Sequence, residues 1–335
     1  MIFGDNIKKF RTEINLTQQE LADISGVNIS IIKHIETGNR GTAIDNLKKI
    51  ADALNVPLAE IYVDDYRPTE IYTVLNSKGG CSKTSIVSNV GYELSKMGKR
   101  VLLVDADLQC NLTYSLGQDF EMSRSIYKAL IDVDHDVNPS NIEDFIRSTG
   151  YENLDVVISD FEMATIEMDL TLKSYRESLM ETLIRPLIDK GVYDYIIFDC
   201  NPMLGLLNQN ILSVSDNIIV PVELSPFGVM GLDVLIRFIK KAQRVNKNLQ
   251  ISGLIKTKVD NRYNMTSKVN ETLELLTSKV DINIYKSFIP TDAKIPEAQW
   301  ERMPLNVYIE GKNKKSKADK QFKAFAKEIM SNSRG

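Results

Sequence analysis

The feature that most constrains the fold is a glycine-bearing loop that follows the apolar run 71–75. It reads Lys-Gly-Gly-Cys-Ser-Lys-Thr-Ser over residues 78–85. A strand that enters such a loop and leaves it as a helix forms a phosphate cradle, because backbone N–H groups and the helix N-terminus face the anion. The lysine then reaches the outer phosphates and the hydroxyl ligates Mg²⁺. We therefore predict a nucleotide site at Lys78, Gly79, Gly80, Cys81, Ser82, Lys83, Thr84 and Ser85.

The loop departs from the common pattern G-x-x-x-x-G-K-[ST]. Ser77 and Ser82 stand at its two glycine positions. An additional lysine, Lys78, precedes the usual one, Lys83. The two serines and the additional lysine indicate which kind of nucleotide-binding protein the chain can be.

Apolar strands alternate with amphipathic helices beyond residue 70. The predicted strands cover residues 71–75, 100–105, 154–158, 195–199, 217–222, 251–257 and 284–289. This alternation is typical of an α/β fold with a doubly wound, mostly parallel sheet and helices on both faces. We expect the ligand at the carboxyl ends of the strands.

Two of these strands end in aspartates. The strand at 100–105 delivers Asp105 and Asp107, and the strand at 195–199 ends in Asp199. One carboxylate can support Mg²⁺ while another orients the water that attacks a phosphate. The alternative is that the paired aspartates cap the following helix. With the phosphate loop beside them, the candidate metal ligands are Thr84, Asp105 and Asp199.

The N-terminal region shows a different pattern, short helices without strands. Thr17 and Glu20 form a capping-box signature, Gly26 supplies a turn, and Asn28 caps the next helix. The predicted inward-facing residues are Ile32, Ile35, Leu47, Ile50, Ala51 and Leu54. Two helices around a short turn indicate a helix-turn-helix module.

A polar stretch that contains proline follows this module and indicates a linker. We therefore predict a small all-α helix-turn-helix domain at 1–64, a linker at 65–69 and a P-loop ATPase domain at 70–335.

Charge is distributed unevenly along the chain, whose formal net charge is −4. Residues 237–335 carry 21 Lys or Arg against 10 Asp or Glu, whereas residues 67–236 carry 13 against 25. A basic C-terminal third suggests a polyanion-binding face. The alternative is that these lysines are scattered over solvated helices.

Composition disfavours several classes of protein. Cys81, Cys110 and Cys200 do not make a disulfide framework, and two histidines argue against histidine-based catalysis or a conventional zinc site. No apolar run approaches the ~20 residues of a membrane-spanning helix. The N-terminus carries no signal-peptide pattern, so we expect a cytoplasmic protein.

Residues 1–62 resemble the Cro/C1-repressor-like (XRE) family of DNA-binding domains. The resemblance rests on the T-Q-x-x-L-A start, the Gly-Val turn and the I-E-x-G end. It implies that the first helix touches a phosphate and that the second faces a DNA groove. The candidate DNA-binding residues here are Gln18, Asn28, Ile29, Ser30, Lys33 and His34. The module is slightly acidic, which weakens its attraction to DNA, so protein docking or dimerisation is the alternative role.

Residues 70–335 resemble the ParA/MinD family of deviant-Walker ATPases. The resemblance rests on K-G-G-x-x-K-T in the loop, V-D-x-D-x-Q-x-N-L-T at 104–113 and Y-D-Y-I-I-x-D-x-x-P at 193–202. Shorter matches include I-V-P-V at 219–222 and E-A at 297–298. The resemblance implies that the chain binds ATP and Mg²⁺ and forms an ATP-dependent homodimer.

The same resemblance assigns catalytic roles. Lys78 looks like the signature lysine, which crosses to the partner's ATP in a sandwich dimer. Lys83 would contact the β- and γ-phosphates of its own ATP, and Asp107 would position the attacking water. Thr84 would ligate Mg²⁺, with Asp105 and Asp199 in its shell.

The chain departs from the family pattern at four positions. Ser82 and Cys110 stand where glycine is usual, and Leu108 and Asn201 replace prolines. A serine N–H can still donate to phosphate, so we expect ATP binding to persist.

ParA dimers bind DNA without sequence preference through basic residues of their C-terminal part, and the matching positions are Arg262 and Lys294. MinD instead appends an amphipathic helix after its last core helix. Here residues 318–330 are predicted to be the core helix itself, so we expect no membrane attachment.

The two resemblances together imply a weak, Mg-dependent DNA-partitioning ATPase, associated with the nucleoid and stimulated by DNA and a ParB-like centromere-binding partner. One alternative is a nucleotide-switched helix-turn-helix transcription regulator. Another is a nucleoid-bound positioner of a protein cargo.

Overall fold

The computed structural model describes residues 4–37, 42–62, 69–132, 141–225, 228, 231–260, 271, 273–274, 277 and 282–332. Contacts divide the chain into two compact units, Met1–Pro68 and Thr69–Gly335. Most of the predicted linker lies outside the described residues. Its last residue, Thr69, is buried in the larger unit, where its hydroxyl donates to the Tyr193 carbonyl at 2.7 Å.

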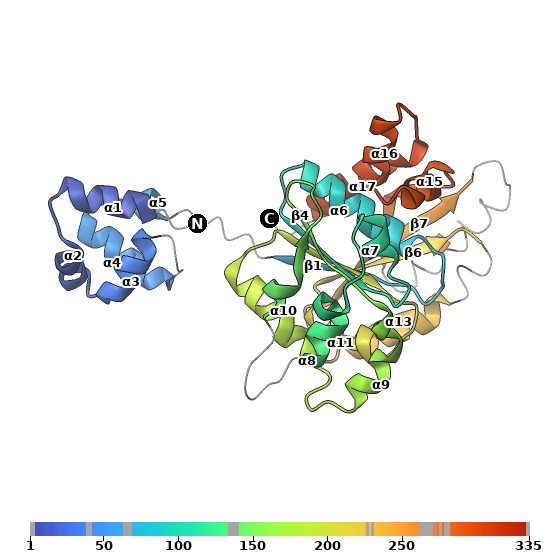
Figure 1. The fold of residues 1–335 in the computed structure, drawn as a ribbon, viewed down its shortest axis with the longest axis horizontal. Helices are drawn as coiled ribbons and strands as arrows, with labels where there is room; N and C mark the ends of the chain where they lie inside the picture. The colour runs from blue at the N-terminus through green and yellow to red at the C-terminus, as the bar shows by residue number, and fades with distance from the viewer. Residues whose placement is uncertain are drawn as a thin grey trace. The chain divides into compact units, whose positions relative to one another are not determined.

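The smaller unit is a bundle of short helices (Figure 1). They are α1 (Gly4–Glu13), α2 (Gln18–Ser25), α3 (Ile29–Glu36), α4 (Ile44–Leu54) and α5 (Leu58–Ile61). Thr17 and Glu20 form the predicted capping box at the start of α2. Gly26, with φ +66°, turns the chain, and Asn28 caps α3 by accepting a hydrogen bond from Ser30 N. The helix-turn-helix prediction is confirmed.

Apolar side chains and one buried ion pair hold these helices together. The predicted inward-facing residues Ile32, Ile35, Leu47, Ile50, Ala51 and Leu54 are all buried. Beside them, Arg11 Nε and Nη2 donate to the two carboxylate oxygens of Glu36 at 2.7 and 2.8 Å. The ion pair joins α1 to α3, so the helix expected to face DNA is fixed by charge as well as by packing.

Removing one partner of this ion pair should destabilise the smaller unit. Arg11→Ala leaves the Glu36 carboxylate buried without its partner, which should cost about 3–5 kcal/mol. Glu13→Ala, which breaks the exposed Lys9–Glu13 pair, is the control and should cost less than about 1 kcal/mol. Hydrogen exchange of the full chain measures both, and only Arg11→Ala should speed exchange in residues 4–37 and 42–62. Equal effects of the two substitutions would contradict the structural role of the buried pair.

Within the described residues, the larger unit contains one eight-stranded sheet in the order β3-β4-β2-β5-β1-β6-β7-β8. The strands are β1 (Glu70–Val74), β2 (Val101–Ala106), β3 (Ile146–Ser148), β4 (Leu154–Val157), β5 (Tyr195–Cys200), β6 (Asn217–Glu223), β7 (Gln250–Val259) and β8 (Ile284–Pro290). Neighbouring strands are parallel except β3 and β4. The seven predicted strands are all present. β3 escapes sequence-based prediction because it is a three-residue edge strand without an apolar run.

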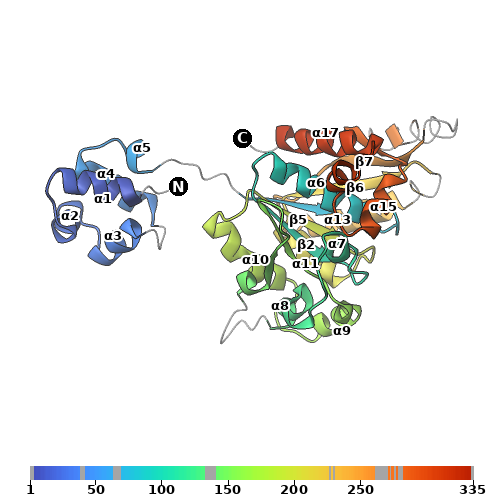
Figure 2. The same cartoon turned by 45° about the horizontal axis from the view of Figure 1, so that its top comes forward.

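Helices cover both faces of the sheet (Figures 1 and 2). One face carries α6 (Lys83–Lys96), α7 (Asn111–Ser115), α15 (Lys294–Trp300), α16 (Leu305–Gly311) and α17 (Lys317–Asn332). The other carries α8 (Ile126–Asp132), α9 (Ile166–Thr171), α10 (Leu179–Lys190), α11 (Leu206–Val214) and α13 (Leu232–Ala242). Short 3-10 helices lie at Met122–Arg124, Ile142–Phe145 and Phe161–Thr165. The predicted doubly wound fold is confirmed.

Among the helices in the described part of the chain, none combines the length and apolarity that crossing a membrane requires.

The register of the central strands positions the site. Asp105 on β2 and Val74 on β1 both pair with Asp199 on β5. Parallel strands in this register bring the loop after β1 and both aspartates to one edge of the sheet, where doubly wound folds bind their ligands.

Candidate functional site

The loop after β1 turns sharply into α6. Asn76 anchors its start, because its Nδ2 donates to the Pro221 carbonyl at 2.6 Å and its Oδ1 accepts from Lys78 N at 2.9 Å. Gly80 and Ser82 have φ values of +70° and +74°. A loop of this shape that leads into a helix N-terminus presents N–H groups to an anion.

Positive φ values occur at both positions where serine or cysteine replaces the glycine of the resembled family. They are +74° at Ser82 and +52° at Cys110. The backbone shape is retained although the residue type has changed. A non-glycine residue in the left-handed region costs roughly 1–2 kcal/mol, so both turns are strained.

Ser82 offers a direct test of this strain. Ser82→Gly should be more stable than Ser82→Ala by about 1 kcal/mol, because glycine adopts this φ without a steric cost. Denaturant unfolding of the two full-length variants measures the difference. If the two variants unfold alike, the left-handed conformation at this position carries no cost.

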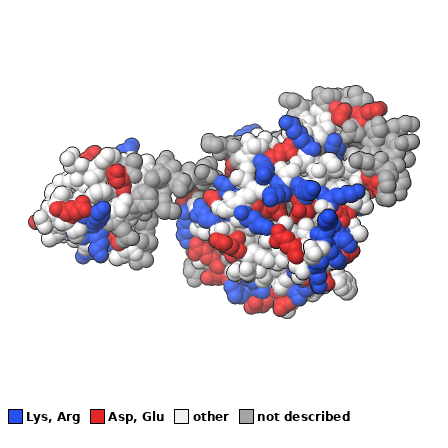
Figure 3. Space-filling view, turned by 90° about the horizontal axis from the view of Figure 1, so that it is seen from above, with Lys and Arg blue, Asp and Glu red and all other residues white. Residues whose placement is uncertain are grey.

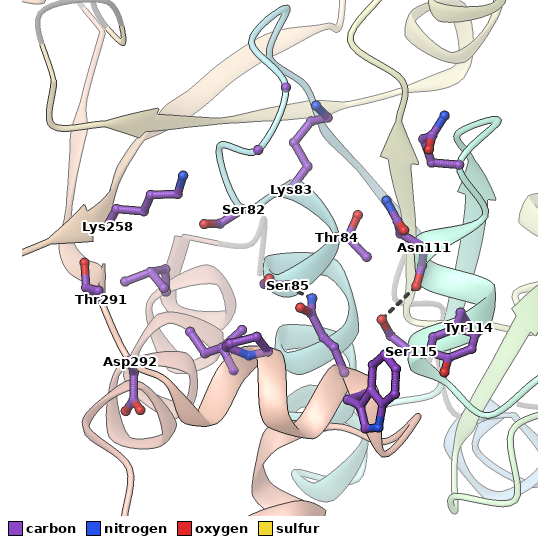
Figure 4. A pocket seen from close by; sticks show the side chains of 18 of the residues that line it. Ser82, Lys83, Thr84, Ser85, Asn111, Tyr114, Ser115, Lys258, Thr291 and Asp292 are labelled. Atoms are coloured by element: carbon purple, nitrogen blue, oxygen red, sulfur yellow. Dashed lines mark hydrogen bonds between the residues drawn. The ribbon is translucent and has the colours of Figure 1, made fainter.

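Lys83 and Thr84 open α6 beneath the loop (Figure 4). Lys83 is buried, and its Nζ donates to the carbonyls of Asn76 and Lys78 at 3.3 and 3.5 Å. Thr84 Oγ1 donates to Asp199 Oδ2 at 2.7 Å. The lysine therefore folds back across the loop, and a hydroxyl and a carboxylate suited to one cation lie side by side.

Asp105 and Asp199 are fully buried next to each other. Burial raises the pKa of Asp105 to about 6, although hydrogen bonds from Thr113 oppose the shift. Burial and the neighbouring Asp105 charge raise the pKa of Asp199 well above its ordinary value. A cation bound here would relieve the cost of keeping both carboxylates ionised.

The residues present fit Mg²⁺, which prefers carboxylate and other oxygen ligands. Among the described residues, Asp199 Oδ1 is a buried oxygen without a hydrogen-bond partner. Both oxygens of Asp105 are occupied, Oδ1 by Asp107 N at 3.2 Å and Oδ2 by the Thr113 amide and hydroxyl at 2.8 and 2.7 Å. Thr84 and Asp199 are therefore the residues best placed to hold the ion, and Asp105 anchors the segment that follows β2.

Asp107 lies on that segment, at the wall of the cavity. Its Oδ1 accepts from Gln109 N at 3.0 Å, and its carbonyl accepts from Ser159 Oγ at 2.9 Å. Ser159 N in turn donates to Thr113 Oγ1 at 3.0 Å. This network fixes Asp107 between the ends of β2 and β4.

A cavity of about 790 Å³ opens over the loop (Figure 4). Its near wall includes the loop, Lys83 and Thr84. Its far wall includes Lys258 from β7 and Trp300 from α15, which the sequence patterns did not single out. Trp300 is the only tryptophan of the chain and is 80% exposed, and that rarity is the one sequence signal that marks it. The volume suits a ligand of nucleotide size.

Lys78 forms an ion pair within its own chain. Its Nζ donates to Glu223 Oε2 at 2.8 Å and to Ser225 Oγ at 3.3 Å. Lys258 Nζ lies 3.6 Å from the same Glu223 oxygen. Partial burial acts to raise the pKa of Glu223, but the Lys78 hydrogen bond and the Lys258 charge outweigh it and lower that pKa.

The candidate DNA-binding residues of the smaller unit lie on or beside α2 and α3. Asn28, Ser30, Lys33 and His34 are exposed, and Ile29 is half-buried. Gln18 is also half-buried, and its Nε2 donates to Glu36 at 2.8 Å.

The two candidate DNA-binding residues of the larger unit differ in status. Lys294 Nζ donates to Glu297 at 2.6 Å, and Glu297 also accepts from Lys314 at 2.9 Å. Arg262 lies outside the described residues. Lys294 is therefore paired within its own chain, although it shares the Glu297 carboxylate with Lys314.

Comparison with known proteins identifies both units. A family profile described as an AAA domain matches residues 69–251, and a helix-turn-helix profile matches residues 7–61. The sporulation initiation inhibitor protein Soj of Bacillus subtilis is 32% identical over 265 residues, which cover 78% of this chain and 99% of Soj. The chromosome partitioning protein ParA of Caulobacter vibrioides is 28% identical over 269 residues, which cover 80% of this chain and 96% of that protein.

A solved structure shares the architecture of the larger unit. Cobyrinic acid a,c-diamide synthase from Mycobacterium smegmatis, with bound ADP and magnesium, superposes with a TM-score of 0.63 at 27% identity. The match covers 78% of this chain and 94% of that one. The chain therefore belongs to the ParA/MinD-type ATPase family and carries a helix-turn-helix domain of the XRE type at its N-terminus.

Proposed function

We propose that this protein is an ATP-dependent DNA-partitioning ATPase that segregates a plasmid or similar element with a ParB-like partner on the nucleoid. The observation that carries the proposal is the meeting of the phosphate loop, the Thr84–Asp199 pair and Asp107 at one nucleotide-sized cavity. The relatives add support, since they include a chromosome partitioning protein and a structure that holds ADP and magnesium.

In this proposal each residue of the site has its own role in ATP hydrolysis. The N–H groups of the loop and the Lys83 ammonium hold the phosphate tail of ATP. Thr84 and Asp199 would hold Mg²⁺, which when bound would neutralise charge on the phosphates. Asp107 accepts a hydrogen bond from the attacking water and aligns it with the terminal phosphate.

A dimer around ATP requires Lys78 to exchange partners. In the single chain its ammonium is bound to Glu223. A partly exposed pair of this kind contributes about 1 kcal/mol or less, so a phosphate of the second chain's nucleotide can displace it. Basal hydrolysis is then weak, because the additional positive charge arrives only with the second chain.

Asp107→Ala separates binding from hydrolysis. We expect ATP-dependent dimers to form and persist while hydrolysis falls by about 100-fold or more, because the water loses its orienting group. Sedimentation and phosphate release with ATP, with and without DNA and a candidate partner, measure the two properties. Asp233→Ala, an exposed acid on α13, is the control and should behave as the wild type. Rapid turnover in Asp107→Ala would overturn the assignment.

Lys83→Ala should abolish the ATP-dependent dimer itself, because the phosphate tail of ATP loses the ammonium that holds it.

A row of lysines on α17 supplies the polyanion-binding face suggested by the charge distribution. This row, here called the α17 stripe, consists of Lys317, Lys320, Lys323 and Lys327, all exposed. Their spacing places them opposite the helix face that carries Phe322 and Phe325 into the core. The salt bridges of the neighbouring segment use Lys312 and Lys314 instead. Figure 3 shows the larger unit from above, where Lys and Arg side chains lie among Asp and Glu side chains.

The helix-turn-helix unit gives specific support to a second candidate function. Its α3 exposes Ser30, Lys33 and His34, groups that can reach base edges or phosphates. A transcription regulator switched by nucleotide would use this unit alone, whereas a partition ATPase would also bind random DNA through the α17 stripe.

Charge reversal in the α17 stripe tests the DNA surface. In the presence of a non-hydrolysable ATP analogue, Lys320→Glu with Lys323→Glu should weaken binding to random-sequence DNA by about 10-fold or more and lower the salt slope by about 2. Lys240→Glu with Lys241→Glu on α13, on the other face of the sheet, is the control. Unchanged affinity in the α17 variant would refute the surface. Protection of a single operator, without coating of random DNA, would favour the regulator.

A further inference from the structure

Lys258, near the end of β7, has a backbone conformation that lysine rarely adopts. Its φ is +52°, and the pairing of β7 with β8 shifts register between Lys256 and Val259. Positive φ in a non-glycine residue costs free energy and recurs at functional sites, where the surrounding structure enforces it. The positive φ therefore marks Lys258 as a candidate functional residue.

The Lys258 side chain extends toward the phosphate loop (Figure 4). A Cβ atom built on Gly80 would lie 3.9 Å from the Lys258 ammonium. Both residues line the cavity that Lys83 and Thr84 also line. The Lys258 side chain is 48% exposed. Its ammonium is therefore accessible to an anion bound in the loop.

Glu223 couples Lys258 to Lys78. The same carboxylate oxygen lies 2.8 Å from the Lys78 ammonium and 3.6 Å from that of Lys258. Lys78 and Lys258 thus share one negative charge. Lys83 instead donates to the backbone carbonyls of Asn76 and Lys78. On this side of the loop the two ammonium groups outnumber the one carboxylate that they share, which favours an anionic ligand beside them.

We propose that Lys258 is a further phosphate-binding residue, supplied by the same chain as the loop, and that Glu223 holds it in place until nucleotide arrives. The ligand group is the phosphate tail of a nucleoside di- or triphosphate, because an ammonium is a compact charge with three donors and no acceptor. The inference rests on the proposed nucleotide binding and adds to it a contact from β7. Lys258 thereby links the end of β7 to occupancy of the loop.

Substitutions that suit the backbone keep the test clear of misfolding. Glycine and asparagine both tolerate a positive φ, so Lys258→Gly and Lys258→Asn remove the ammonium while leaving the fold at least as stable. Calorimetric titration of the full chain with the Mg²⁺ complexes of ADP and a non-hydrolysable ATP analogue should show both variants binding roughly 10- to 100-fold more weakly, the range for a hydrogen bond to a charged group. Lys258→Arg should recover part of the loss.

The matched control is Lys286→Asn, an exposed lysine on the neighbouring strand β8, and it should bind both nucleotides as the wild type does. Wild-type affinity in Lys258→Gly and Lys258→Asn would overturn the inference and leave the proposed function intact. A wild-type chain that binds neither nucleotide would overturn the proposed function itself.

A second substitution tests the shared carboxylate. Glu223→Gln releases both ammonium groups and should tighten binding of the ATP analogue by about 3-fold, in line with the small contribution of a partly exposed ion pair. In the Lys258→Gly background the gain should be smaller, because one of the two lysines is gone. An equal gain in both backgrounds would show that Glu223 acts through Lys78 alone and would overturn its role toward Lys258.

Discussion

Two buried carboxylates set side by side are the constraint around which the larger unit is organised. Asp105 and Asp199 pair across β2 and β5 without contact with solvent, where like charges repel strongly and lack hydration. Hydrogen bonds from the surrounding protein replace the hydration that these carboxylates lose on burial. The amide and hydroxyl of Thr113 in α7 bind one carboxylate, and the Thr84 hydroxyl at the start of α6 binds the other. The helices that follow β1 and β2 are thus oriented by the same acidic pair that a cation would complete.

Much of the fold could be predicted because its signals are local. Buried parallel strands are continuous apolar runs, the starts of α2 and α3 carry their own caps, and the loop with its following helix is contiguous in the chain. The three-residue strand β3 has no such signal. Lys258 and Trp300 lie more than a hundred residues after the loop in the sequence. They reach the cavity only because the later strands and helices pack beside it. Their proximity to the loop is a property of tertiary structure that no local pattern contains.

Side chains that look available in a sequence can be engaged by acidic side chains of the folded chain. Gln18 donates to Glu36, Lys78 to Glu223 and Lys294 to Glu297. In each case the partner lies on another element or another turn, and the acid decides whether the polar group is free for a ligand. Glu297 is the extreme case, since hydrogen bonds from Lys294, Tyr308 and Lys314 lower its pKa to about 2. The distribution of glutamates therefore shapes the basic surface of the protein as much as the number of lysines does.

The left-handed backbone at Ser82 and Cys110 has a consequence for how such sites are recognised. A letter-based motif that requires glycine at these positions passes over this chain, whereas a description by dihedral angles does not. The orientation of the N–H groups depends on φ and ψ, and glycine is only the least costly way to reach those values. Phosphate loops are better defined by the sign of a torsion angle than by the residue that adopts it, and a chain with serine at the turn, as at Ser82, belongs among them.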